Sequence, residues 1–196
     1  FFTFYVITYG VTLGIATSAN ILSMYFFYEL LTLVTTPLVL HTLKREAVLA
    51  ARTYLYYSIG GAAFAFIGMI FVIIYGSTTD FIYGGVMDVN PYTGNVNLLL
   101  FIYVLAFMGF GVKAAVCPFC AWLPQAGVAP TPVTALLHAV AVVKSGAFAI
   151  MRLTYYSFGT DFLKGTWAQY TVMGVTIFTI VFGCSMAVRE RHIKRI

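Results

Sequence analysis

The sequence predicts an all-α, polytopic membrane protein with about six transmembrane helices, one of them discontinuous. Hydrophobic residues make up 61% of its 196 residues and charged residues only 9%, whereas about 25% of an average soluble domain is charged. Four stretches without an acidic or strongly basic residue each exceed the roughly 20 residues that cross a bilayer core. These stretches are 1–28, 53–79, 114–143 and 166–188.

Each span is predicted to be helical, because a single segment that crosses a bilayer must satisfy its own backbone hydrogen bonds. The six spans have the approximate ranges 1–17, 20–42, 47–75, 96–126, 131–153 and 166–188. The fifth span is expected to start with Thr131 as N-cap and Pro132 at the first helical position, where its missing N–H costs nothing.

The fourth span, 96–126, is the one that we expect to be discontinuous. Pro118 and Pro124 lie inside its apolar run, and Gly111 precedes Lys113. Proline removes a helical hydrogen bond and clashes with the preceding turn. Broken helices at membrane depth are tolerated where the backbone lines a cavity or is packed in protein. We therefore expect a break near Lys113 that marks a binding or transport site.

Two basic clusters predict the orientation of the chain, since cytoplasmic loops carry an excess of lysine and arginine. One cluster lies in loop 43–52 and the other in the C-terminal tail; their members are Lys44, Arg45, Arg52, Arg189, Arg191, Lys194 and Arg195. Both are predicted to be cytoplasmic, and loop 76–95, which has no lysine or arginine, to lie outside. The net charge of +5 then reflects membrane topology, and no nucleic-acid partner is expected.

Four ionisable side chains fall inside the predicted spans: Glu29, Lys113, His138 and Lys144. An acid or base at the centre of a membrane helix costs about 2.5–3.5 kcal/mol, so each needs a partner. Burial weakens proton binding by a lysine and a nearby carboxylate strengthens it, while histidine titrates near neutral pH. We interpret the four residues as part of an ion path, with protons as the main candidate. A structural ion pair or protonated acid at Glu29, and a structural role for His138, are the alternatives.

Cys117 and Cys120 form a C-x-x-C pattern, which in soluble proteins indicates zinc or thiol redox chemistry. A zinc site needs four ligands, and His138 is the one further candidate nearby, so no metal site is predicted. The sequence shows no phosphate-binding loop, dinucleotide fingerprint, iron–sulfur cysteine set or haem motif. We therefore expect no cofactor, redox centre or catalytic residue in this chain, and an energy supply from a redox or ion-gradient partner.

Several segments carry a resemblance to a known family. Residues 25–30 read YFFYEL, residues 111–124 read GVKAAVCPFCAWLP, and residues 129–146 contain His138 and Lys144. They resemble the glutamate-bearing fifth helix, the lysine-bearing seventh helix and the eighth helix of the antiporter-like subunits of respiratory complex I, Mrp-type sodium/proton antiporters and membrane-bound hydrogenases. The family pattern has histidines where this chain has Cys120 and Gly127.

The resemblance implies that this chain corresponds to family helices four to nine, within a core of about fourteen helices built from inverted repeats. Residues 1–153 would form the first half-channel repeat, and residues 154–196 would begin the second, so the chain is expected to be a fragment. By resemblance, Glu29 and Lys113 form a coupled pair, while His138 and Lys144 carry protons toward a central polar axis.

The expected function is therefore proton translocation by an antiporter-like subunit of a multisubunit energy-converting complex. The expected location is a prokaryotic plasma membrane or an equivalent energy-coupling membrane. Expected partners are other membrane subunits, a peripheral redox module, protons and, as a further ion, Na⁺. Two alternatives stay open: an Mrp-type Na⁺/H⁺ antiporter subunit, and a non-pumping scaffold subunit of a membrane oxidoreductase.

Overall fold

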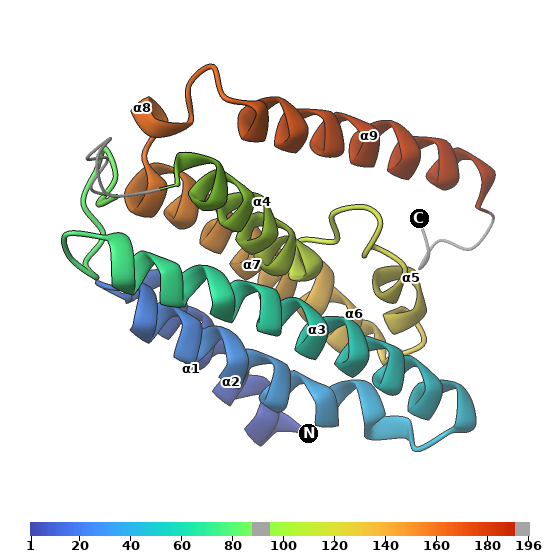
Figure 1. Ribbon diagram of the computed structural model, residues 1–196. Helices are drawn as coiled ribbons and strands as arrows, with labels where there is room; N and C mark the ends of the chain where they lie inside the picture. Colours follow the sequence, from blue (N-terminus) through green and yellow to red (C-terminus); the bar gives the residue numbers. More distant parts are fainter. Residues whose placement is uncertain (88–94, 191–196) are drawn as a thin grey trace.

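The computed structural model of the protein describes residues 1–87 and 95–190, and the regular structure in these ranges is helical (Figure 1). Two isolated backbone bridges, Asn20 to Asp80 and Gly76 to Met87, tie down the loop that follows the third helix. The predicted all-α fold is thus confirmed. Part of the predicted orientation depends on residues outside the described ranges, namely Asp88, Arg191, Lys194 and Arg195.

Five helical segments are long and apolar enough to cross a membrane. They are α2 with its 3-10 extension η1 (Ile21–Val39 and Leu40–Thr42), α3 (Arg45–Tyr75), α4 (Val96–Lys113), the segment Thr131–Phe158 and α9 (Trp167–Arg189). The first predicted span is the apolar helix α1 (Phe2–Thr17), whose 16 residues fall short of the other five. Asn20 starts α2 by accepting a hydrogen bond of 2.8 Å from the Ser23 N–H.

The predicted discontinuity of the fourth span is present. Helix α4 ends at Lys113, a non-helical stretch follows, and the short helix α5 (Trp122–Ala126) resumes the path. In Figure 1, α4 leads into an irregular loop before α5. The fold thus exposes backbone groups between two apolar helices, which must find partners inside the protein.

The fifth span is less regular than the sequence predicts. It comprises α6 (Thr131–Ala135), the π-type turn η2 (Leu136–Val140), α7 (Val142–Arg152) and a second π-type turn, η3 (Leu153–Phe158). Helix α6 begins at Thr131 and Pro130 flanks it, so Thr131 is its first residue rather than its N-cap. The segment also runs past the predicted end at 153, because η3 continues the helical path to Phe158. The division of the chain at 153 remains a prediction.

Close backbone contacts hold the helices around the break. A Cβ atom on Gly109 in α4 would lie 2.5 Å from the backbone nitrogen of Ala65 in α3, a distance that only glycine allows. Helix α9 lies at the edge of the bundle in Figure 1, where its Thr179 hydroxyl accepts a hydrogen bond of 3.0 Å from the Cys117 N–H, and Ala168 alone of its residues is buried. Most of the buried apolar side chains of the core come from α1, α2, α3, α4 and α7, with smaller contributions from α5, α6 and α9.

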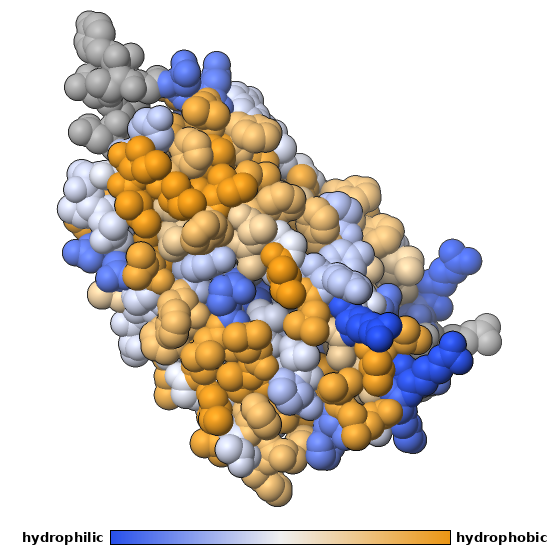
Figure 2. All heavy atoms as spheres, turned by 60° about the horizontal axis from the view of Figure 1, so that its bottom comes forward, coloured by the Kyte–Doolittle hydropathy of each residue, from blue (hydrophilic) through white to orange (hydrophobic). Residues whose placement is uncertain are grey.

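The outer surface agrees with a membrane environment. Figure 2 shows a face covered mostly by hydrophobic side chains, interrupted by small hydrophilic groups. Large apolar residues are exposed on several helices, among them Phe26 at 62%, Ile74 at 65% and Ile180 at 64%. Apolar surface of this extent on the membrane-length helices is what lipid contact or neighbouring membrane subunits would cover.

Candidate functional site

Lys113 is the last residue of α4, and a C-terminal capping motif fixes its position. The Val116 N–H donates to the Gly111 carbonyl at 2.9 Å, and the Ala115 N–H donates to the Val112 carbonyl at 3.1 Å. Ala115 adopts φ 58°, the left-handed conformation that this Schellman-type ending requires. A cation at this end is stabilised by the partial negative charge of the helix dipole. The break therefore creates a favourable place for a buried ammonium.

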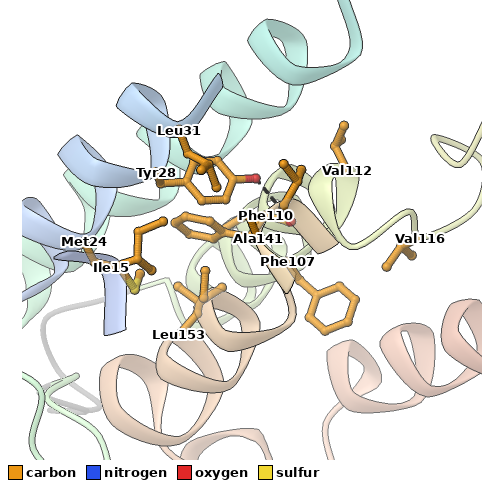
Figure 3. Close-up of a cluster of buried hydrophobic side chains, with 14 of the residues drawn as sticks. Ile15, Met24, Tyr28, Leu31, Phe107, Phe110, Val112, Val116, Ala141 and Leu153 are labelled. Atoms are coloured by element: carbon orange, nitrogen blue, oxygen red, sulfur yellow. Dashed lines mark hydrogen bonds between the residues drawn. The ribbon is translucent and has the colours of Figure 1, made fainter. Parts of the chain in front are cut away.

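The Lys113 side chain is fully buried and is held by Tyr28 of α2. Its Nζ donates a hydrogen bond to the Tyr28 carbonyl oxygen, and it lies 3.4 Å from the centre of the Tyr28 ring. The Tyr28 hydroxyl is directed at the carbonyl oxygens of Gly109 and Phe110, at 3.4 and 3.3 Å. Figure 3 shows this ring projecting from α2 toward the end of α4. One tyrosine thus contacts both the lysine and the last turn of its helix.

Glu29 is the next residue of α2 after Tyr28, and no ion pair joins its carboxylate to Lys113 among the described residues. Their charges interact electrostatically, yet the Lys113 ammonium donates to the Tyr28 carbonyl. The Glu29 Oε1 atom is buried and has no hydrogen-bond partner among the described residues. The Lys113 ammonium therefore has two alternative partners. One is the Tyr28 carbonyl to which it donates in the structure, and the other is the Glu29 carboxylate.

A polar face continues along α2 from Glu29. Thr32 is buried, and its Oγ1 has no hydrogen-bond partner in the described part of the chain. Thr35 shares a hydrogen bond of 2.8 Å with the Tyr54 hydroxyl of α3, and the Tyr54 ring lies 5.2 Å from the ring of Trp122 in α5. Sequence reasoning missed these groups, although the spacing of 29, 32 and 35 places them on one helix face.

His138 lies in the π-type turn η2, on the other side of the break. Its Nε2 atom is buried and is without a hydrogen-bond partner within residues 1–87 and 95–190. The imidazole interacts with the backbone of Leu123 in α5. Turns of this type occur often at functional sites, since they redirect a side chain within a helix. His138 therefore interacts with α5, after the break, whereas Lys113 lies before the break as the last residue of α4.

Lys144 is placed differently from the other three residues, because its side chain is exposed on α7. The helix that carries it does reach the site: a Cβ atom on Gly146 would lie 2.5 Å from the Ala114 backbone nitrogen and 2.9 Å from the Lys113 carbonyl carbon. The structure therefore does not bring Lys144 into the buried group. Lys144 lies two residues before Gly146, where α7 approaches the end of α4, but its own side chain is exposed.

The residues expected at the helix break take three positions. Gly111 lies in the last turn of α4, Pro118 in the non-helical stretch and Pro124 within α5. Cys117 and Cys120, also in that stretch, are free and partly buried thiols. No cluster of three or more His, Cys, Asp or Glu side chains suited to a metal ion occurs in the described ranges.

Comparisons with known proteins identify the family and the fold of this chain. Residues 18–196 match the family described as NADH:quinone oxidoreductase/Mrp antiporter, TM. An Na⁺/H⁺ antiporter subunit of Alkalihalophilus pseudofirmus is 31% identical over 100% of this chain and 24% of its own length. The chloroplastic NAD(P)H-quinone oxidoreductase subunit 5 of Lobularia maritima is 29% identical over 93% of this chain and 24% of its own length.

Among solved structures, a chain of the membrane-bound sulfane sulfur reductase, an archaeal respiratory membrane complex, has the same fold. The TM-score is 0.80 at 21% sequence identity, and the match covers 98% of this chain and 38% of that one. This chain thus spans about a quarter of the length of the curated relatives that it matches.

Proposed function

Because the chain belongs to the NADH:quinone oxidoreductase/Mrp antiporter transmembrane family, we propose that it forms a proton-translocating half-channel. It would act within an antiporter-like subunit of a multisubunit energy-converting membrane complex. The observation that carries the proposal is the fully buried Lys113 at the end of a broken helix, beside Glu29 and held by Tyr28. Intramembrane ionisable residues mark ion pathways by default.

The proposed switch is a movement of the Lys113 ammonium between two partners. In the structure it donates to the Tyr28 carbonyl, and the adjacent Glu29 carboxylate is the second partner. A carboxylate at about 6 Å and an effective dielectric of about 20 stabilises an ammonium by about 3 kcal/mol, which is a roughly 100-fold change in proton binding. A change of distance between Glu29 and Lys113 therefore loads or releases one proton.

His138 and Lys144 extend the path in this proposal. His138 has a buried Nε2 that no other described residue contacts by a hydrogen bond, so it can accept a proton through a bridging water. Lys144 is exposed on α7 and would pass protons toward the central polar axis that the family resemblance implies. Residues 1–153 would then form one half-channel, and residues 154–196 would begin the second repeat.

The positive-inside pattern supports the proposed orientation, with loop 43–52 and the C-terminal tail on the cytoplasmic side. The relatives are subunits of larger assemblies, which supports other membrane subunits as partners. A peripheral redox module would supply energy in a complex I-like or hydrogenase-like assembly. Sodium/proton exchange is the second candidate function, and the similarity to the Na⁺/H⁺ antiporter of Alkalihalophilus pseudofirmus favours it.

The test is proton uptake by vesicles that contain the complex with Lys113→Ala or Glu29→Gln. We expect both variants to assemble and to lose coupled proton uptake. A buried tyrosine on the same helix as Lys113 offers a control, since Tyr103→Leu alters α4 ten residues away from the lysine. Full uptake by the Lys113 and Glu29 variants would instead support a non-pumping scaffold. Uptake that requires Na⁺ in the unmodified complex would favour the exchanger.

A further inference from the structure

Arg152 is the last residue of α7, and its cationic side chain lies among aromatic rings, away from Lys144 earlier in the same helix. Its guanidinium carbon lies 4.9 Å from the Phe81 ring centre, 5.1 Å from that of Phe148 and 4.8 Å from that of Tyr156. Three aromatic rings therefore surround a permanently charged group, whose planar fork of N–H donors can still bind an anion.

A cavity of about 380 Å³ opens beside this guanidinium. Its lining combines one cation, three phenol groups and two apolar side chains, and consists of Tyr83, Phe148, Met151, Arg152, Tyr155 and Tyr156. None of these lining residues is acidic. Tyr83 is 80% exposed and Met151 is 50% exposed. The cavity is therefore on the outer surface of the helix bundle, with a charged end and an apolar wall.

The position along the helix is that of a membrane interface. Arg152 is followed by the 6 residues of η3, after which the helical segment ends, so it lies about 9 Å from that end. Two hydrogen bonds hold the loop that follows α3 against this end of the segment. The Gly84 N–H donates to the Tyr155 carbonyl at 3.2 Å, and the Val86 N–H donates to the Ser157 carbonyl at 3.0 Å. Tyrosines gather at membrane–water interfaces, and arginine extends toward headgroups from this depth.

We propose that this cavity binds the phosphate of an anionic phospholipid. The phosphodiester group is the anion present at headgroup depth, and the guanidinium fork matches phosphate oxygens in two parallel hydrogen bonds. The tyrosine hydroxyls can donate further hydrogen bonds, and an acyl chain can lie along Met151 and Phe148. A lipid fits better than an acidic partner protein, because the Met151 and Phe148 side chains give the cavity an apolar wall beside the guanidinium.

The experiment uses the purified complex that contains this chain. Copurified lipid is counted by native mass spectrometry, and the thermal midpoint of the complex is measured as phosphatidylglycerol is added after delipidation. The test variants are Arg152→Gln and Arg152→Lys. The control variant is Lys164→Gln, because Lys164 is an exposed cation that follows the same helical segment and lines a different cavity.

We expect Arg152→Gln to weaken phosphatidylglycerol binding at least tenfold and to abolish the thermal shift, while Lys164→Gln changes neither. Arg152→Lys should retain part of the binding, which shows that loss in Arg152→Gln does not reflect misfolding. Equal lipid retention in Arg152→Gln would overturn the proposal. It would also fail if inorganic phosphate alone gave the full shift, or if Arg152→Gln released a protein subunit while lipid binding was unchanged.

Discussion

Replacing the Tyr28 ring tests how the buried lysine is held. Tyr28→Leu removes the aromatic face that lies 3.4 Å from the Lys113 Nζ, but it leaves the backbone carbonyl that accepts its hydrogen bond. A desolvated cation–π contact contributes about 2 kcal/mol. Destabilising the protonated lysine by about 2 kcal/mol corresponds to a roughly 30-fold effect on a step that requires it.

Tyr28→Phe is the matched variant, because it keeps the ring and removes the hydroxyl. The hydroxyl contacts of 3.3 and 3.4 Å with Phe110 and Gly109 are long, so their loss should cost no more than about 0.5–1 kcal/mol. We therefore expect proton uptake to fall about 30-fold in Tyr28→Leu and less than about fivefold in Tyr28→Phe.

The assay is coupled proton uptake by proteoliposomes, measured with a pH-sensitive dye and normalised to the amount of assembled complex. Tyr103→Leu controls for general destabilisation, because Tyr103 is a buried tyrosine of α4 that bonds to Thr154 rather than to the lysine. Equal losses in Tyr28→Leu and Tyr28→Phe, or normal uptake in Tyr28→Leu, would refute the reasoning.

Three further predictions follow from the helix break and its neighbours. Ala115→Gly should raise the free energy of unfolding by about 1 kcal/mol, because glycine adopts the left-handed conformation without strain; an unchanged or lower thermal midpoint would contradict this. Gly146→Ala should lower stability by about 1–3 kcal/mol, since its Cβ would lie 2.5 Å from the Ala114 backbone nitrogen; a midpoint equal to that of the parent would argue against the close approach. His138→Gln should keep the complex assembled but reduce proton uptake at least about tenfold, because glutamine cannot carry a proton; full uptake would assign His138 a structural role.

The sequence predicted the features that depend on local chemistry. Helix lengths followed from apolar stretches, and the break after Lys113 followed from Pro118 and Gly111, because a proline within an apolar run cannot continue a regular helix. The pairing of Glu29 with Lys113 was expected from the family resemblance, because the need of each residue for a partner inside the membrane does not by itself select Lys113 over Lys144.

Other features depend on packing between helices and could not be predicted. The π-type turns around His138 and before Phe158 have no local signature in the sequence. Depth along a span does not give the direction of a side chain, so Lys144 was not expected to be exposed on α7. The role of Tyr28 was hidden among the neighbouring aromatic residues, because only the approach of α4 distinguishes it from Tyr25 and Phe27.

A double-mutant cycle on Glu29 and Lys113 tests the central claim most directly. Coupled proton uptake is measured for Glu29→Gln, Lys113→Ala and the double variant in the assembled complex. If the two residues act as one switch, the double variant should lose no more activity than either single variant, which is strong non-additivity. Losses that multiply would show that the acid and the lysine act independently, and would contradict the account.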